Sequence, residues 1–417
     1  MLKHIFGGNS SKVHNAKEVY NAIRKYSPIT KKDLHKTLEM PLTTLNRAIE
    51  ALINLGLIEE GSICESNMGR KPISLKIKSS SFYLIGVEIS RTSTKIVFTD
   101  MSLNIINKAC FEIDDKIEPI TLVKRIVDEI RRALNALKVG LDKVLGIGVG
   151  TVGALNRERG EILEVEGFSH EGWRNFPIKL TLEKELGILT VLNDGANAAV
   201  LAEYWSDIGK KHLNMVYLSV GVGFRCGIIS NGLMTNNRKH ISNDVYGHIV
   251  VSAHGRPCYC GNQGCVERYV TIPAIVQSYK DSFVNNQRTS QDFGQELITW
   301  EKICEAVKAG EKLALNVITE AAFYLSAGLV NIINAINPEA VIIGGAAINT
   351  CGILYDFAVS LTKEKLKTTN DTVSYFKGTY GEDEIAVGAA TLILDYYLGK
   401  EVSEIVLDRV EYAISKQ

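Results

Sequence analysis

The sequence of 417 residues predicts an α/β body of two lobes that follows a small N-terminal domain of the winged helix-turn-helix class. Three observations support this fold class. Helix signals crowd residues 15–61, strand and helix patterns alternate from Phe82 onward, and the same alternation recurs after Met215. A chain of this length is expected to form two or three domains rather than one.

Composition is typical of a globular protein, with 46% hydrophobic residues, 23% charged residues and a formal net charge of zero. We expect no transmembrane helix, because no apolar run approaches the required length, and no signal peptide, because the N-terminus lacks an apolar core. These features predict a cytoplasmic protein without a membrane partner, in which the eight cysteines form no disulfide framework. Five scattered cysteines are expected to be buried as small apolar residues: Cys64, Cys110, Cys226, Cys304 and Cys351.

Charge is unevenly distributed along the chain. Residues 1–80 hold 13 Lys and Arg against seven Asp and Glu, a net charge of +6, so the remaining residues carry −6. A basic N-terminal domain on an acidic body suggests an anionic partner for the N-terminus. Uneven surface charge without a partner is the alternative.

The N-terminal domain shows the pattern of three short helices. Ala16, Val19 and Ile23 repeat at helical spacing, and Thr30 is placed to cap a helix over residues 31–38. A turn at Met40-Pro41-Leu42 precedes a third helix, which we expect Thr43 or Thr44 to cap and Gly56 to end. Its inner face is expected to consist of four apolar residues: Leu45, Ile49, Leu52 and Ile53.

The outward face of this third helix has residue types that bind base edges in the major groove of DNA: Thr43, Thr44, Asn46 and Arg47. Two strands are expected to follow as a wing, with Arg70 and Lys71 forming a basic corner suited to phosphate or minor-groove contact. We therefore predict binding to a double-stranded DNA operator. The alternative is a small helical bundle with a solvated charged face.

The stretch 187–204, GILTVLNDGANAAVLAEY, raises the question of catalysis. A β-branched run ends at Asn193-Asp194-Gly195, and an alanine-rich helix begins there. A carboxylate at the C-terminal end of a strand is a common place for a general base in α/β enzymes. Asp194 is therefore a candidate base or, alternatively, only the cap of the next helix.

A cysteine cluster predicts a metal site. Cys258, Cys260 and Cys265 follow His248, and three thiols with one imidazole suit tetrahedral Zn²⁺. Such a set leaves no open coordination position, which makes the predicted zinc structural. The alternative is a group of buried cysteines, and His254 is a competing ligand that we expect to face solvent.

Together these motifs resemble the ROK family of repressors, open reading frames and sugar kinases, over essentially the whole chain. The resemblance implies an actin/hexokinase-like, ribonuclease H-like body, a sugar site in a cleft between the lobes, the zinc ligands named above and a homodimer or homotetramer. It implies the following domains: a winged helix-turn-helix domain over 1–76, a linker over 77–81, lobe 1 over 82–194 with 388–417, and lobe 2, with the zinc site and oligomerisation surface, over 195–387.

Comparison with the family's kinase motifs indicates that catalysis has been lost. The first phosphate loop of the kinases, DIGGT, is EISRT at residues 88–92, and the second, GTGIGGG, is GVGFRCG at residues 221–227. A third glycine turn keeps Gly344-Gly345 but continues with Ala346. Without these glycines the backbone cannot approach a phosphate as closely.

The kinase base falls on Gly195 when residues 186–199 are aligned without a gap, which makes Asp194 a cap or a sugar contact. A shifted turn would return Asp194 to the position of the base. The resemblance further assigns the sugar site to Asn193, Asp194, Glu267, the zinc ligand His248 and Gly172. Val245 stands where the family has a glutamate, so two carboxylates that normally hold a hexose are missing.

We therefore predict a transcriptional regulator, a repressor of carbohydrate-metabolism genes, that senses a sugar or sugar derivative in a degraded kinase cleft and has no enzymatic activity. A ligand there would change the angle between the lobes and so the spacing of two DNA-binding domains. One alternative is an active ATP-dependent sugar kinase with a DNA-binding appendage. Another is a DNA-binding scaffold that responds to no ligand.

Overall fold

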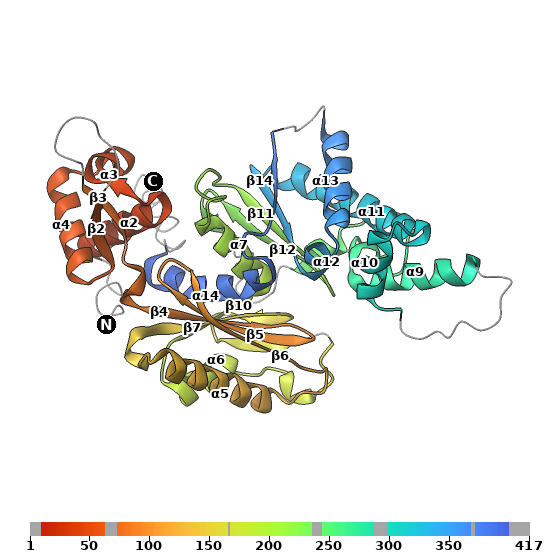
Figure 1. Cartoon of the computed structure of the whole chain (residues 1–417), viewed down its shortest axis with the longest axis horizontal. Helices are drawn as coiled ribbons and strands as arrows, with labels where there is room; N and C mark the ends of the chain where they lie inside the picture. The colour runs from red at the N-terminus through yellow and green to blue at the C-terminus, as the bar shows by residue number, and fades with distance from the viewer. Residues whose placement is uncertain are drawn as a thin grey trace, which may run out of the picture. The chain divides into compact units, whose positions relative to one another are not determined.

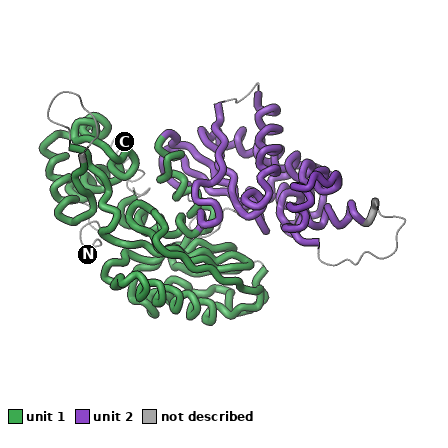
Figure 2. The backbone as a smooth tube through the Cα atoms, viewed as in Figure 1, with its two compact units in different colours: residues 1–210, 386–417 green, residues 211–385 purple. Residues whose placement is uncertain are grey.

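A computed structural model gives the fold of the chain and describes residues 10–62, 73–165, 167–235, 244–286, 298–367 and 372–399. The chain divides into two compact units (Figure 2): unit 1 comprises residues 1–210 and 386–417, and unit 2 comprises residues 211–385. The expected lobe boundaries lay at 194/195 and 387/388. The first unit boundary falls later, at 210/211, because helix α7 (Gly195–Trp205) packs on strands of the unit 1 sheet, and the second falls two residues earlier, at 385/386.

In the residues that the structure describes, the N-terminal domain has three helices and a small antiparallel sheet of order β1-β3-β2 (Figure 1). Its elements are α2 (Ser11–Tyr26), β1 (Ile29–Thr30), α3 (Lys31–Leu38), α4 (Leu42–Asn54), β2 (Ile58–Ser62) and β3 (Ile73–Ile77). Val19, Leu34 and Leu45, one from each helix, are fully buried. Ile53, expected on the inner face of α4, is only half-buried.

The helix caps of this domain agree with the sequence at one position and disagree at another. Thr30 caps α3, accepting the Asp33 N–H at 3.1 Å, as predicted. The prediction that Thr43 or Thr44 caps α4 is wrong, because α4 already begins at Leu42 after Pro41 and has no side-chain cap. The wing residues between β2 and β3, including Arg70 and Lys71, lie outside the described residues. The expected linker over 77–81 is largely a short 3-10 turn, η1 (Ser79–Ser81).

The body of unit 1 is a mixed five-stranded sheet of order β10-β7-β4-β5-β6. Its strands are β4 (Tyr83–Ile89), β5 (Ser93–Asp100), β6 (Ile105–Glu112), β7 (Val144–Thr151) and β10 (Thr190–Asp194). Strands β4, β7 and β10 are parallel, so their C-terminal ends share one edge. A small hairpin, β8 (Ala154–Asn156) with β9 (Glu161–Glu164), follows β7.

Helices cover both faces of this sheet (Figure 1). On one face lie α5 (Pro119–Leu137) and α6 (Ile178–Leu186), which bury a core of branched apolar side chains. On the other face lies α14 (Glu384–Leu398), which returns from unit 2. Gly86 of β4 and Gly148 of β7 permit this approach, because a Cβ at either position would overlap a carbonyl of α14.

Unit 2 contains a second five-stranded sheet of order β13-β12-β11-β14-β15. The strands are β11 (Met215–Val220), β12 (Phe224–Ser230), β13 (Leu233–Met234), β14 (Ala340–Gly344) and β15 (Ser374–Lys377). The helices that follow or separate them are η4 (Asp244–His248), α8 (Glu267–Val270), α9 (Ile272–Asn286), α10 (Trp300–Lys308), α11 (Lys312–Ile336), α12 (Ala346–Thr350) and α13 (Gly352–Leu366). This sheet and its helices share one apolar core.

Two expectations from composition need correction. Helix α11 is long and apolar enough to cross a membrane by length and composition, although no such run was expected. It is half buried inside unit 2 and packs on α9, α10 and α13, which is typical of a core helix in a globular domain. Cys110 is exposed rather than buried, because it lies on the edge strand β6; Cys226, Cys304 and Cys351 are buried, and Cys64 lies outside the described residues.

Candidate functional site

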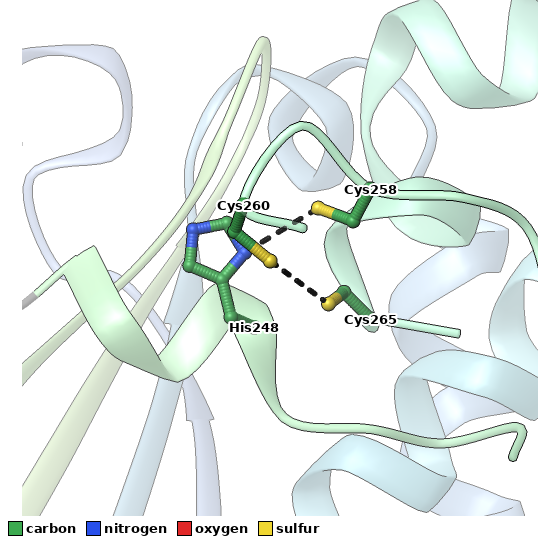
Figure 3. A group of neighbouring side chains, drawn as sticks. All are labelled: His248, Cys258, Cys260 and Cys265. Atoms are coloured by element: carbon green, nitrogen blue, oxygen red, sulfur yellow. Dashed lines mark hydrogen bonds between the residues drawn. The ribbon is translucent and has the colours of Figure 1, made fainter. Parts of the chain in front are cut away.

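Four predicted metal ligands converge in unit 2 (Figure 3). His248 ends the turn η4, and Cys258, Cys260 and Cys265 lie in the loop that leads to α8. The imidazole and the three sulfurs each offer a ligand atom, and these atoms lie within 4.8 Å of one another. His254, the competing histidine, is exposed and does not belong to the cluster.

The spacing of the ligand atoms fits tetrahedral zinc. Cys258 Sγ lies 3.5 Å from His248 Nδ1, and Cys260 Sγ lies 3.6 Å from Cys265 Sγ. Zinc with Zn–S bonds of about 2.3 Å and a Zn–N bond of about 2.0 Å separates its ligands by roughly 3.5–3.8 Å. The two measured pairs therefore have the separation that the ion requires, and all four ligand atoms lie within 4.8 Å of one another.

Backbone geometry holds this loop in shape. The Cys258 N–H bonds the Asn262 carbonyl at 2.8 Å, and the Gly261 N–H bonds the Cys258 carbonyl at 3.1 Å, closing a tight turn. Gly264 has a φ of +72°, and a Cβ there would overlap the Ser252 carbonyl, so this position requires glycine.

The thiols differ in acidity. Burial raises the pKa of Cys265 to about 12 and also raises the pKa of Cys258, whereas the backbone N–H of Asn262 lowers that of Cys260. Zinc binds thiolates, so a bound cation would offset the cost of ionising the two buried thiols. The donor set fits a structural ion, since all four positions of a tetrahedron are supplied by the chain.

Glu267, a predicted sugar contact, is tied to the cysteine loop. Its Oε1 accepts a hydrogen bond from the hydroxyl of Tyr259 at 2.9 Å, and Tyr259 stands between two of the cysteines. Its Oε2 accepts the Phe224 N–H at 3.4 Å. The order of the metal loop therefore determines how the Glu267 carboxylate is placed.

The Asn193-Asp194 turn lies at the C-terminal end of β10 in unit 1. Asp194 caps α7, because its Oδ1 accepts the N–H groups of Ala196 at 2.9 Å and Asn197 at 3.1 Å. Asn193 Oδ1 accepts the Asp194 N–H at 2.9 Å. Both side chains are buried, with 5% and 3% exposure, and Asp194 is held as a cap by its own helix.

Arg157 contacts this turn and was not predicted from the sequence. It projects from the β8–β9 hairpin, and its Nη1 lies 3.5 Å from Asn193 Oδ1. Burial lowers the pKa of the guanidinium, and the Asp194 carboxylate opposes that shift. The two residues are 36 positions apart, and no local signal in the sequence connects them.

Gly172 lies in an exposed turn of unit 1, η3 (Glu171–Trp173). Its N–H donates to His170 Nδ1 at 3.0 Å. Trp173 anchors the turn in the core, with its Nε1 donating to the Ile117 carbonyl at 2.8 Å.

The predicted sugar contacts are divided between the units. Asn193, Asp194 and Gly172 belong to unit 1, whereas His248 and Glu267 belong to unit 2. A common pocket formed by these five residues stays a prediction.

Glu384, at the start of α14, contacts the glycine turn after β14 and was likewise not predicted from the sequence. Glu384 is 3% exposed, and its Oε1 accepts the Gly345 N–H at 3.0 Å. A Cβ on Gly344 would lie 2.5 Å from Glu384 Oε1 and 2.6 Å from the Tyr217 hydroxyl. The space beside this turn is therefore filled by side chains of unit 2.

The predicted DNA-contacting face of α4 is open to solvent. Thr43, Asn46 and Arg47 are exposed, and Thr44 is half-buried. The turn that precedes α4 is held by a bond of 2.7 Å between the His35 ring Nδ1 and the Met40 carbonyl.

Comparisons with known proteins match different shares of the chain: some match mainly the α/β body, and others match almost the whole chain. The ROK family profile matches residues 84–396. The xylose repressor of Bacillus subtilis strain 168 is 21% identical over 385 residues, 92% of this chain and 96% of the repressor. A glucokinase of Halalkalibacterium halodurans is 27% identical over 321 residues, 75% of this chain and 96% of the glucokinase.

A solved structure is similar over almost the whole length. A ROK family transcriptional regulator, described as a homolog of the Escherichia coli MLC protein, aligns with a TM-score of 0.75 and 25% identity. The alignment covers 92% of this chain and 96% of the regulator.

Proposed function

The chain belongs to the ROK family, and from this we propose that it is a DNA-binding transcriptional regulator, a repressor of carbohydrate-metabolism genes. One observation carries the proposal. The xylose repressor of Bacillus subtilis and the solved ROK regulator align over 92% of the chain, and several other relatives named repressor or regulator over 76–90%, whereas the glucokinase aligns over 75%. The additional length corresponds to a domain that a kinase does not require.

The N-terminal domain is proposed to bind DNA as a winged helix-turn-helix. Helices α3 and α4 are joined by a tight turn, and the exposed face of α4 offers Thr43, Asn46 and Arg47 to a major groove. Antiparallel strands β2 and β3 form the base of the wing. We keep Thr44, and Arg70 and Lys71 in the wing, as further proposed contacts.

Loss of kinase activity is the finer part of the proposal. Asp194 caps α7 through its Oδ1, and Glu384 takes the Gly345 N–H that the kinase resemblance would assign to the nucleotide. A carboxylate beside a backbone N–H also repels phosphate. Together with the altered loops at 88–92 and 221–227, these contacts support a body that binds a ligand without transferring a phosphoryl group.

The ligand is proposed to be a sugar or sugar derivative, held by Asn193, Asp194, Gly172, His248 and Glu267. The regulator is proposed to be a homodimer or homotetramer in the cytoplasm, in which ligand binding alters the spacing of two DNA-binding domains. Half-sites one turn of DNA apart are separated by about 34–36 Å, so a modest change in that spacing weakens binding. Structural zinc at the cluster of His248 and the three cysteines would stabilise the loop that places Glu267.

The DNA-binding proposal is tested with Arg47→Ala. We select a preferred duplex from a random pool and measure affinity by fluorescence anisotropy at fixed salt. Loss of one base contact is expected to weaken binding by about tenfold or more. Arg132→Ala, which removes an exposed arginine from α5, is the matched control and should leave affinity unchanged. Equal affinity of wild type for selected and random duplexes would contradict the proposal.

The kinase alternative is tested by coupled ADP release with ATP, Mg²⁺ and a panel of hexoses. We expect no turnover above background. Turnover in wild type that disappears in Asp194→Asn would support the alternative of an active sugar kinase and would identify Asp194 as the base.

The zinc proposal is tested by metal analysis of the purified protein. We expect one zinc per chain in wild type, loss of that zinc in Cys265→Ser, and full zinc content in the control Cys110→Ser, whose thiol is exposed on β6. Full zinc content in Cys265→Ser would remove this cysteine from the ligand set.

The scaffold alternative is tested by thermal unfolding with a panel of sugars and polyols. A ligand that binds only the folded state raises the melting temperature with concentration. We expect at least one member of the panel to do so, whereas a ligand-independent scaffold would show no shift with any of them.

A further inference from the structure

We propose that helix α7 couples the effector site to the DNA-binding domain. Asn193 and Asp194 directly precede α7 and contact its first turn, and the last turn of α7 contacts helix α2. The inference rests on the proposed function, because it names the route by which that site is regulated. The contacts that carry this inference all join residues of unit 1.

Helix α7 is expected to behave as a rigid body. Every residue from Gly195 to Tyr204 is buried, so the helix is held on all sides. Gly388 of α14 crosses it so closely that a Cβ would overlap the Ala198 carbonyl. With a rise of about 1.5 Å per residue, such a helix transmits a shift over roughly 15 Å without bending.

The first turn of α7 would respond to a ligand. Asn193 Oδ1 accepts the Asp194 N–H at 2.9 Å and lies 3.5 Å from both Asn197 Nδ2 and Arg157 Nη1. A ligand hydroxyl that donates to Asn193 Oδ1 competes with these groups, two of which belong to the start of α7. Binding there therefore changes the contacts that set the position of the helix.

The last turn of α7 contacts the DNA-binding domain through two aromatic residues. Lys25 Nζ donates to the Tyr204 hydroxyl at 3.1 Å and lies 4.2 Å from the centre of the Tyr204 ring. The Arg24 guanidinium lies 4.0 Å from the centre of the Trp205 ring. Lys25 is only 7% exposed, so the contact is largely screened from water.

Helix α14 completes the junction. Asn21 Nδ2 donates to the Leu398 carbonyl at 2.7 Å, and desolvation raises the pKa of the half-buried Asp395 carboxyl while the charge of Arg24 opposes that rise. Buried charges tolerate little misalignment, because their contacts must balance the loss of hydration. A shift of α7 would therefore move α2 with it, and α2 forms the core of the DNA-binding domain together with α4.

The link is tested by cutting it at α2 while leaving both binding sites intact. The double variant Arg24→Gln with Lys25→Gln removes the charge over the Trp205 ring and the charge over the Tyr204 ring, together with the hydrogen bond to the Tyr204 hydroxyl, and keeps both side chains long. The matched control is Arg125→Gln, which removes a similar contact, a guanidinium 3.9 Å from the centre of the Phe111 ring on the other face of the sheet.

The first readout is the ratio of DNA dissociation constants with and without sugar, using D-xylose, D-glucose and N-acetyl-D-glucosamine as probes. Coupling between two sites commonly amounts to about 5–150-fold in affinity. We expect the double variant to reduce the wild-type ratio at least about fivefold, with each separate affinity little changed, and the control to keep the ratio. An unchanged ratio in the double variant overturns the proposal.

The second readout needs no effector. Asn193→Ala disturbs the first turn of α7 directly, and amide hydrogen exchange then reports on α2. We expect faster exchange in α2 in the otherwise wild-type chain and no such change when the junction is cut. If no sugar alters DNA binding, the sensing part of the proposed function fails, while this arm still decides whether α7 couples the two regions. If the rate of amide hydrogen exchange in α2 is the same in wild type and in Asn193→Ala, the link is rejected.

Discussion

Two turns, one in each unit, lead from a parallel strand into a helix, and each is closed by a carboxylate. After β10, Asp194 accepts the N–H groups of Ala196 and Asn197. After β14, the Gly345 N–H is accepted by Glu384, a residue 39 positions away. Backbone N–H groups at such turns commonly hold the phosphates of nucleotides.

The difference between these turns lies in the origin of the carboxylate. Asp194 caps the helix that directly follows it, so its contacts are local in the sequence. The boundary between β10 and α7 is therefore enough to predict its role as a cap. Glu384 comes from the start of another helix and depends on the tertiary fold. Two different routes therefore lead to one result, a turn whose backbone donors are used by the chain itself, and at the turn after β14 this supports the proposed loss of nucleotide binding.

The largest effect is expected for Asp194→Ala. It leaves two buried N–H groups without their acceptor, and we expect a loss of about 2–3 kcal/mol in the free energy of unfolding of unit 1. Urea unfolding followed by circular dichroism measures this loss. Asp194→Asn should recover most of the stability, because asparagine is also a good cap; failure of both variants alike would indicate that the charge matters more than the cap.

A smaller effect is expected for Glu384→Ala. One N–H loses its acceptor, but removing a buried carboxylate also removes its desolvation cost, so we expect a loss of about 1–2 kcal/mol in unit 2. Glu384→Gln keeps an acceptor oxygen and should unfold close to wild type. If the alanine variant is as stable as wild type, the contact to Gly345 contributes nothing and the comparison between the turns breaks down.

The smallest effect concerns the caps of the N-terminal domain. Thr30→Ala removes the acceptor for the Asp33 N–H, and we expect a cost of about 1 kcal/mol. Thr43→Ala removes no cap, and we expect a change within about 0.5 kcal/mol. Thermal unfolding of the two variants in parallel measures the difference, and a larger loss for Thr43→Ala would place the helix start where the sequence predicted it.

Local patterns allowed the sequence to predict much of this molecule. The spacing of apolar residues located α2, the Thr30 cap located α3, and the grouping of three cysteines after His248 located the metal cluster, because these signals lie within one element or one loop. Thr43 misled the prediction because threonine is a common capping residue, whereas α4 begins one residue earlier, at Leu42 directly after Pro41.

Contacts between distant segments could not be predicted in the same way. Arg157 meets Asn193 only after a hairpin folds back, and Glu384 meets Gly345 only after α14 begins beside β14. The junction of Lys25 with Tyr204 spans 179 positions. In each case the side chain is ordinary in its own segment and gains its role from the fold.

The central claim is that a sugar controls DNA binding by this protein. Its most direct test is the fluorescence anisotropy of wild type on a selected duplex, at fixed salt, with and without each sugar of the panel. The account predicts tight, specific binding that one sugar weakens by about fivefold or more. Binding no tighter than to random DNA, in the presence and absence of every sugar, would contradict it.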